Sequence, residues 1–406
     1  MDAHQAAELA ARASYGRLVA YLASRWRDLA RAEDALGDSL VAALETWPRT
    51  GVPGKPEAWL LTAARRHLVD GARHTKVEAA ALADLRLVVD EAHEAMSAEA
   101  VFPDERLKLL FTCAHPAINE AARTPLMLQT VLGLDAARIA SAFLVAPAAM
   151  GQRLVRVKAK IRGAGIRFAI PEPPELPARL EAVLEAIYAA YGSGWEDVAG
   201  GDPRRRGLAE EAIWLGRLVV GLLPDEPEAR GLLALMLHCE ARRGARRTLG
   251  GAYVPLTQQD IGLWSRPMIE EAEEILADAA RSGRPGRFQL EAAIQSAHAQ
   301  RAVTGRTDWG AIALLYEGLL RCAPTIGARV GHAAALGELR GAEAGLAALE
   351  AIPADAVKTY QPYWALRAHL LKTLRRSEQA EQAYDRAMAL SEDAAVREFL
   401  ADQAAR

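Results

Sequence analysis

A run of cations without neighbouring acids is the part of this sequence best suited to hold a ligand. No acidic residue occurs between Asp135 and Glu172, whereas basic residues recur throughout that interval. Lys and Arg bind phosphates by charge and hydrogen bonding, which gives affinity for nucleic acid but little sequence information. A basic face that is merely solvated remains the alternative. The cations are Arg153, Arg156, Lys158, Lys160, Arg162 and Arg167.

The elements that carry these cations are predicted to be two short helices joined by a tight turn. Residues 134–144 are amphipathic, and Pro147 suits the start of a second helix. In that second helix, apolar residues recur as one stripe that would pack on the first helix. The stripe consists of Met150, Leu154, Val157 and Ile161. The pattern predicts a helix-turn-helix whose second helix enters a DNA groove.

Positions along the second helix suggest different contacts with DNA. Gln152 and Arg153 lie near its beginning, where side chains reach base edges. Arg156, Lys158 and Lys160 are better placed for phosphates.

Catalytic chemistry is not predicted. The sequence contains no nucleophile–base arrangement, no His-Glu-x-x-His motif, no Gly-rich phosphate loop and no paired Cys motifs. Cys113 and His115 are two residues apart, but two ligands are a weak metal signal and we expect a buried structural role. We therefore expect no enzyme, no cofactor and no metal site.

The compartment is predicted from cysteine usage and hydropathy. Cys113, Cys239 and Cys322 are too few and too far apart for a disulfide framework, which fits a reducing environment. Apolar runs are interrupted well before the roughly 18 residues of a membrane span, and the N-terminus lacks the pattern of a signal peptide. We expect a cytoplasmic protein.

The 406-residue chain is predicted to be all-α and divided into several parts. Ala, Leu, Arg and Glu dominate, apolar residues recur at three- and four-residue spacing, and Pro and Gly mark the breaks. The predicted parts are residues 1–76, a linker 77–102, a second domain 103–170 that contains the helix-turn-helix, a Pro-rich linker 171–177 and a helical extension 178–406.

Two motifs in the first part carry a family resemblance. The segments AEDAL…W (32–47) and PEAWLLTAARRHLVDGAR (56–73) resemble region two of extracytoplasmic-function sigma factors of RNA polymerase, and 104–162 is similar to their region four. The C-terminal portion resembles the subgroup with a long tetratricopeptide-like extension. The implied architecture is two small helical sigma domains followed by a helical-repeat domain.

The resemblance implies roles for specific residues. The acidic face of the first helix would dock on core RNA polymerase, and the loop and helix that follow would read the promoter −10 element as single strand. The alternative for Trp59 is a core position, which is the more common role of such an aromatic residue. Polymerase binding is assigned to Glu33, Asp34, Asp38 and Leu40, and −10 contact to Lys55, Trp59, Arg65, Arg66 and Arg73. The −35 element is assigned to Gln152, Arg153, Arg156, Lys158 and Lys160.

The extension is predicted to contain helical hairpins from about residue 306. Residues 363–391 place small residues at helix contacts, as in a tetratricopeptide hairpin, although no strict 34-residue period is visible. Such hairpins would bind a protein partner or another part of the chain, or simply pack. The predicted function is therefore a sigma factor that binds core polymerase and promoter DNA, with a regulatory or stabilising extension.

Departures from the family pattern keep a second hypothesis open. Gly37 replaces a usual Gln, Arg138 replaces a usual Glu, and the recognition helix begins with the bland Pro147-Ala148-Ala149. The alternative is a helical-repeat interaction scaffold with a degenerate sigma-like front.

Overall fold

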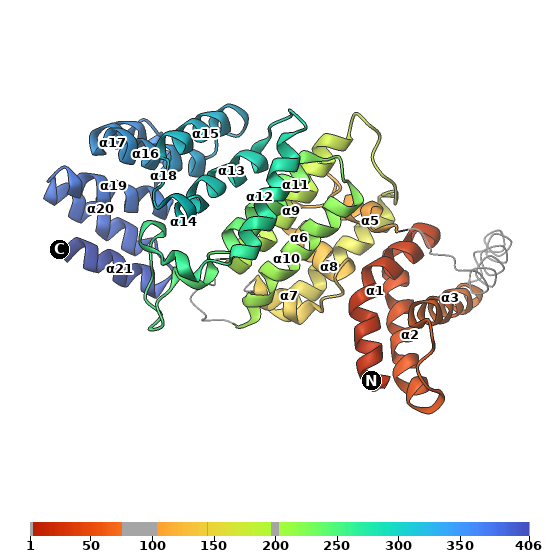
Figure 1. Cartoon of the computed structure of the whole chain (residues 1–406). Helices are drawn as coiled ribbons and strands as arrows, with labels where there is room; N and C mark the ends of the chain where they lie inside the picture. The colour runs from red at the N-terminus through yellow and green to blue at the C-terminus, as the bar shows by residue number, and fades with distance from the viewer. Residues whose placement is uncertain (1–2, 75–103, 144, 196–202, 406) are drawn as a thin grey trace. The chain divides into compact units, whose positions relative to one another are not determined.

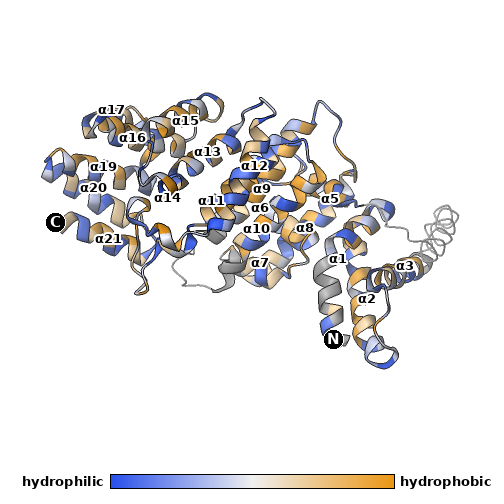
Figure 2. Cartoon of the chain, in the orientation of Figure 1, coloured by the Kyte–Doolittle hydropathy of each residue, from blue (hydrophilic) through white to orange (hydrophobic). Residues whose placement is uncertain are grey.

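The computed structural model describes residues 3–74, 104–143, 145–195 and 203–405. Within these ranges the regular elements are helices, and an isolated bridge pairs Arg247 with Tyr253. The chain divides into two compact units, Met1–Ser193 and Gly194–Arg406. Hydrophobic and hydrophilic stretches occur on the same helices in both units, as Figure 2 shows. The prediction of an all-α chain is confirmed for the described residues.

The first unit begins with three packed helices, α1 (Ala3–Trp26), α2 (Leu29–Thr50) and α3 (Pro56–His74), shown in Figure 1. Asp28 starts α2, because its side chain accepts a hydrogen bond from the Arg31 backbone N–H. Burial of large apolar side chains holds the helices together. These include Leu18, Leu22, Leu36, Trp47 and Leu60, all at most 1% exposed. We call residues 3–74 the first module.

The rest of the first unit, which we call the second module, contains five helices among its described residues. They are α5 (Arg106–Cys113), α6 (Glu120–Thr130), α7 (Ala136–Ala142), α8 (Pro147–Gly163) and α9 (Leu176–Trp195). The Thr124 hydroxyl on α6 donates to the Ala186 carbonyl oxygen on α9 at 2.9 Å, and Arg179 on α9 donates to the Phe111 carbonyl oxygen. Helix α9 therefore packs on α5 and α6.

The boundary between the two compact units lies after the predicted Pro-rich linker, because α9 packs with the first unit. The Pro-rich stretch 171–177 precedes α9, whereas the division between units falls after Ser193. The physical reason is that α9 buries Leu184, Ile187 and Tyr191 almost completely. A Pro-rich segment marks a break in helix, which does not have to be a break between domains.

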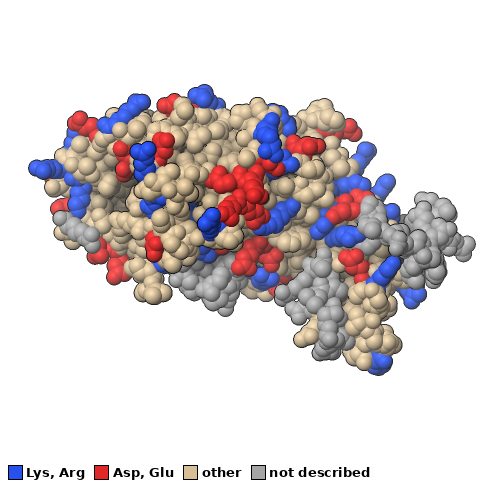
Figure 3. Space-filling view, in the orientation of Figure 1, with Lys and Arg blue, Asp and Glu red and all other residues tan. Residues whose placement is uncertain are grey.

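The second unit opens with α10 (Pro203–Leu222), α11 (Pro227–Glu240), α12 (Arg266–Ala280) and α13 (Arg287–Ala299). Short 3₁₀ segments lie between α11 and α12. Glu228 on α11 caps α13, because its carboxylate accepts the Phe288 and Gln289 backbone N–H groups at 2.9 and 3.2 Å. Acidic side chains gather over α12 in Figure 3.

Among the remaining helices, α15 packs on α16, α16 on α17 and α19 on α20, around two hydrophobic clusters. The predicted hairpin at 363–391 corresponds to α19 and α20, and Ala368, Ala380 and Ala383 are at most 3% exposed. Its helical character is confirmed, while its assignment as a tetratricopeptide repeat stays a prediction. The helices are α14 (Arg301–Thr304), α15 (Trp309–Cys322), α16 (Ile326–Arg340), α17 (Ala342–Glu350), α18 (Ala354–Val357), α19 (Gln361–Thr373), α20 (Ser377–Ala389) and α21 (Ala394–Ala405).

Among the described residues, no helix combines the length and the hydrophobicity needed to span a lipid bilayer.

Candidate nucleic-acid interface

The basic helix α8 buries its apolar stripe as predicted. Met150, Leu154 and Ile161 are at most 2% exposed, and Val157 is partly buried. Pro147 occupies the first turn, where its missing N–H costs nothing and its φ suits a helix. The short helix α7 precedes it and packs against it. Helix α7 lies within the predicted range 134–144 and α8 begins at the predicted Pro147. The buried stripe leaves the opposite face of α8 available.

The available face of α8 carries cations that point to solvent. Arg156 and Lys160 are exposed, as is Gln152 near the N-terminal end, while Arg153 is partly buried. Exposed guanidinium and ammonium groups at successive turns are the kind of side chain that binds phosphates. Four of the five residues predicted to contact DNA through this helix therefore lie on or beside an accessible surface.

The fifth predicted contact, Lys158, has a protein partner instead. Its ammonium Nζ lies 2.5 Å from Glu33 Oε2 on α2, and the two side chains are 14% and 8% exposed. One turn later, Arg162 Nη1 lies 3.2 Å from Asp28 Oδ2, at the start of the same α2 helix. One edge of α8 is thus paired with the first module.

The acidic helix α2 presents only part of its predicted docking face. Asp34 and Asp38 are exposed and Leu40 is half-buried, whereas Glu33, predicted to be exposed, is buried. Burial raises the pKa of the Glu33 carboxyl above its usual value, although the charge and hydrogen bond of Lys158 lower it. The expectation of an exposed Glu33 is corrected, because the second module covers this position.

A small open pocket marks the join between the acidic and basic helices. Its volume is about 450 Å³. It is lined by Tyr15, Glu33, Asp34, Gly37, Asp38, Gln129 and Lys158. Asp34 and Asp38 thus sit at the rim of the contact between the modules.

The predicted −10 residues on α3 and just before it are divided between the core and the surface. Trp59 contacts Trp47 edge to face with ring centroids 5.5 Å apart, so it is part of the packing between α2 and α3. Lys55 and Arg66 are exposed. The side chain of Arg73 lies outside the described residues.

Arg65 is also packed inside the first module. It is 7% exposed and its Nη2 donates to the Tyr21 hydroxyl at 2.5 Å. Its guanidinium lies over the Tyr21 ring, 5.2 Å from the centroid, which is a cation–π arrangement. The expectation of a solvent-facing Arg65 is corrected for this structure, because a tyrosine of α1 provides a partner that local sequence does not reveal.

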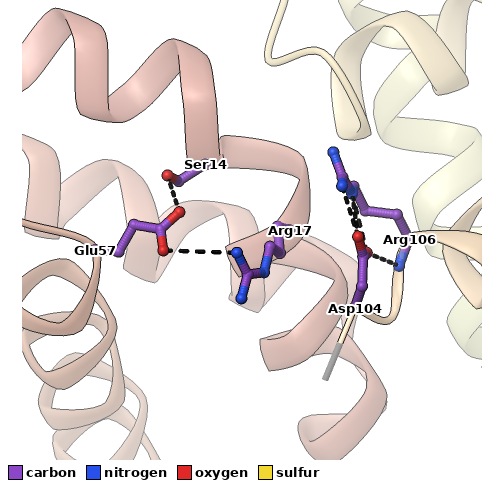
Figure 4. Close-up of polar contacts among 5 residues, drawn as sticks. All are labelled: Ser14, Arg17, Glu57, Asp104 and Arg106. Carbon is purple, nitrogen blue, oxygen red and sulfur yellow. Dashed lines mark hydrogen bonds and ion pairs between the residues drawn. The ribbon is translucent and has the colours of Figure 1, made fainter. Parts of the chain in front are cut away.

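Polar contacts also tie α1 to α3 (Figure 4). Glu57 accepts a hydrogen bond from the Ser14 hydroxyl and lies 3.8 Å from Arg17 Nη1. Asp104 accepts from Arg106 through both the backbone and the guanidinium. Burial raises the pKa of the Asp104 carboxyl, but the Arg106 hydrogen bonds outweigh this effect and the pKa lies below its usual value. The Asp104–Arg106 contacts are local and lie at the beginning of the second module.

The predicted burial of Cys113 is confirmed. Its side chain is fully buried and its Sγ lies 3.4 Å from the Thr130 hydroxyl, and burial raises the pKa of the thiol to about 12. His115 instead accepts the Ala117 backbone N–H at Nδ1. Within the described ranges, no group of three or more metal-ligating side chains is found.

Sequence reasoning missed the residues that join the modules: Tyr15, Gly16, Asp28 and Gly133. Asp28 carries a recognisable signal as the cap of a helix, but its second partner, Arg162, lies 134 residues away. Such contacts depend on tertiary packing, so no local pattern announces them.

Comparison with known proteins supports the sequence resemblance at the N-terminus. Residues 11–77 match sigma-70 region 2, and residues 179–280 match a family of unknown function, DUF6596. An uncharacterized protein of Rhizobium meliloti (strain 1021) is 39% identical over 380 residues, which covers 92% of this chain and 89% of the relative. No solved structure matches the chain.

The region 2 match contains α2, α3 and every residue predicted for polymerase docking and −10 contact. Proteins of the sigma-70 family act as transcription initiation factors and not as enzymes. The chain belongs to the same family as the Rhizobium meliloti protein and carries a sigma-70 region 2 domain at its N-terminus.

Proposed function

We propose that this chain is a sigma factor of the extracytoplasmic-function type, which binds core RNA polymerase and directs promoter-specific initiation. The observation that carries the proposal is an exposed acid pair on α2, Asp34 and Asp38, within a sigma-70 region 2 match. Charge complementarity would steer this pair onto a basic polymerase surface. Polymerase performs the chemistry, so the chain needs no catalytic group.

DNA contact is divided between the two modules in this proposal. Exposed Lys55 and Arg66, with Trp59, serve the −10 element, and α8 serves the −35 element. The buried stripe of α8 supports a defined orientation, with Gln152 and Arg153 toward bases and Arg156 and Lys160 toward phosphates. The helical extension regulates or stabilises the sigma modules.

The test is binding to purified core RNA polymerase. The double variant Asp34→Arg, Asp38→Arg reverses the docking charge at two exposed positions one helical turn apart, so the fold should survive. We expect wild type to bind and the variant to lose at least tenfold in affinity, because like charges oppose docking. Comparable binding by both proteins would contradict docking through this face.

The chain offers a matched control on α21. Glu398 and Asp402 are also exposed and spaced by one turn. The variant Glu398→Arg, Asp402→Arg makes the same change in net charge, and we expect it to bind as wild type does. Equal losses in the two double variants would mean that overall charge, not the α2 surface, determines binding.

A second candidate function is favoured by the start of α8. Ala148 and Ala149 are exposed where base-reading side chains would be expected, and their methyl groups offer no hydrogen bonds. This bland tip suits a protein-interaction scaffold whose sigma-like front no longer reads promoters.

Salt dependence of DNA binding separates the two candidates. Removing one cation that binds a phosphate should flatten the slope of log K against log salt by about 0.9. We therefore expect Arg156→Ala, Lys160→Ala to reduce the slope by about 2. A wild-type slope near zero would favour the scaffold function.

A further inference from the structure

We propose that the second unit contains a binding site for a phosphate group, formed by Arg242 after the end of α11 and Arg301 at the start of α14. Helices α11 and α13 pack against each other (Figure 1) and precede these two residues in the chain. The loop 256–265 lies beside the end of α11, because the Ser265 N–H donates to the Ala241 carbonyl oxygen at 2.8 Å. The site belongs to the helical extension, so it does not depend on the sigma function proposed above.

Arg242 differs from two nearby arginines in its lack of an acidic partner. Arg243 donates to both carboxylate oxygens of Glu240, at 2.5 and 2.8 Å, and Arg247 forms an ion pair with Asp393. Arg242 pairs with no carboxylate in the part of the chain that the structure describes, although it is only 7% exposed. Such an arrangement is unusual, because burial removes the water that would otherwise stabilise the charge.

Neutral groups hold the Arg242 guanidinium in place. Its Nε donates to the His238 carbonyl oxygen at 3.3 Å, its Nη2 donates to the side-chain oxygen of Gln295, and Cys239 Sγ lies 3.9 Å from Nη2. The C-terminus of α11 adds at most about half an elementary negative charge. These groups therefore orient the guanidinium, but they do not balance its full positive charge.

Arg301 places a second positive charge close to the first. Its guanidinium donates to the Thr257 and Gln259 carbonyl oxygens, at 2.6 and 2.8 Å, and lies 5.1 Å from the centroid of the Trp264 ring. Burial, followed by the charge of Arg242, lowers the pKa of Arg301, so the two cations repel each other. Among the described residues, no carboxylate pairs with Arg301 either. An anion bound between the two guanidinium groups would replace this repulsion with attraction.

Two neutral side chains near the arginines can donate hydrogen bonds to an anion. Burial, followed by the charges of Arg242 and Arg301, lowers the pKa of His298 to about 4, so its ring is neutral at pH 7 and lies near both cations. Trp264 is 7% exposed, and its Nε1 has no hydrogen-bond partner within the described ranges. Buried polar groups usually form hydrogen bonds, and an oxyanion would accept the one that this indole N–H donates.

Two acidic side chains near the cluster have donors of their own. Glu273 accepts a hydrogen bond from the Ser296 hydroxyl at 2.6 Å and lies 3.7 Å from His238 Nε2. Glu291 accepts from Arg287 at 2.8 Å. These carboxylates are therefore engaged elsewhere and do not pair with the two arginines of the proposed site.

The charge of the cluster favours a phosphate over a carboxylate. The two guanidinium groups carry one positive charge each, whereas both neighbouring histidines are neutral. A phosphate ester carries a charge of about −1.5 to −2 near pH 7 and offers three acceptor oxygens, whereas a carboxylate carries a single charge. The planar guanidinium also suits phosphate, because it can donate two parallel hydrogen bonds. Inorganic phosphate and the phosphate ester of a metabolite share this chemistry.

Calorimetric titration of the full chain at pH 7.5 tests the site, with inorganic phosphate and glucose 6-phosphate as probes and glucose as the control. At constant ionic strength in sodium chloride, we expect saturable binding of at least one phosphate probe and no binding of glucose. Binding of inorganic phosphate would support a site for the free ion, and binding of glucose 6-phosphate alone a site for a phosphate ester. If neither probe binds, the proposal is overturned and the arginines only hold the loop 256–265 in place.

The variant Arg301→Gln removes one charge at a partly buried position and keeps a side chain that can donate hydrogen bonds. We expect its dissociation constant for the bound probe to rise about tenfold or more, because a charge-assisted hydrogen bond to phosphate is lost. Arg306→Gln is the matched control, since Arg306 is exposed and the change in net charge is the same. We expect this control to bind as wild type does, and equal losses in the two variants would overturn the site.

A measurement on the wild-type chain covers the case in which Arg301→Gln does not fold. Hydrogen exchange is compared with and without a saturating concentration of the phosphate probe that binds. We expect slower exchange in residues 256–265 and 295–304, because the ligand links these segments, and no change in α19. Slowing that is absent from these two segments, or that extends equally to α19, would overturn the proposed location.

Discussion

Replacing Lys158 with methionine tests whether the ion pair with Glu33 exists in solution. Methionine keeps most of the side-chain length but removes the charge, which leaves the Glu33 carboxylate buried beside an apolar group. The carboxylate then has two ways to avoid this cost: it takes up a proton, or the modules separate and expose it to water.

Protonation sets the upper limit of the expected loss. The ordinary pKa of a Glu carboxyl, 4.5, lies 2.5 units below pH 7. Protonating such a carboxylate at pH 7 therefore costs roughly 3 kcal/mol, at about 1.36 kcal/mol per unit. We expect Lys158→Met to lower the free energy of separating the two modules by up to this amount. The double variant Glu33→Gln, Lys158→Met should lose about 1 kcal/mol or less, because no charge is left unpaired.

The sign of the pH dependence follows from the direction of the Glu33 shift. Burial holds the folded-state pKa above the unfolded value, so the folded state takes up the proton first as pH falls. The stabilisation that Glu33 protonation gives the folded state over the unfolded state is therefore greatest near and below pH 4.5, and it is lost as pH rises through the folded-state pKa. The penalty of Lys158→Met should be large at pH 7 and smaller at pH 5.

Hydrogen exchange of α2 peptides provides the assay, because it reports the opening free energy of one region in a chain with several parts. Wild type, Lys158→Met and the double variant are compared at pH 7 and pH 5 after correction for intrinsic exchange. A loss below about 0.5 kcal/mol that does not change with pH would refute a buried Glu33–Lys158 pair.

Two further predictions concern parts of the chain away from this pair. Burial, with a smaller contribution from Arg242, lowers the pKa of His238 to about 4. The stability of the second unit should therefore fall as pH drops from 6.5 toward 4, because the unfolded chain protonates first. In thermal unfolding from pH 7.5 to 5, the melting temperature of His238→Gln should decline less than that of wild type, and an identical decline would argue against a role for this group. Removing residues 178–406 takes away the Ala186 carbonyl that accepts the Thr124 hydrogen bond, so hydrogen exchange in α5 and α6 should become faster. A chain that ends at residue 195 keeps α9 and should exchange as slowly as the full chain in α5 and α6. Equal protection in the two truncated chains would contradict a structural role for α9.

Several features of the fold could be predicted because their signals are local. The stripe of Met150, Leu154 and Ile161 repeats at helical spacing, and burial on one face is the direct consequence of that spacing. Pro147 marks a helix start for a similarly local reason. The hairpin of α19 and α20 was visible in the same way, from small residues at contact positions.

The candidate site was only partly predictable because exposure is a property of the whole molecule. Glu33 and Asp34 are adjacent acids on the same helix, yet one is buried under Lys158 and the other is exposed. Arg65 and Arg66 differ in the same manner: Arg65 is buried and donates a hydrogen bond to the Tyr21 hydroxyl, whereas Arg66 is exposed. A helical period assigns a residue to a face, but it does not say which faces another module will cover.

The sequence by itself determined that the chain is helical, that region 2 lies at its N-terminus and that α8 is a basic amphipathic helix. These properties follow from propensity, periodicity and charge within short segments. Tertiary structure alone decided which charges meet, because Lys158 and Glu33 are 125 positions apart and come together only where the two modules pack. Packing at van der Waals distance selects one arrangement of the modules, and that arrangement determines which charged groups remain free to bind a partner.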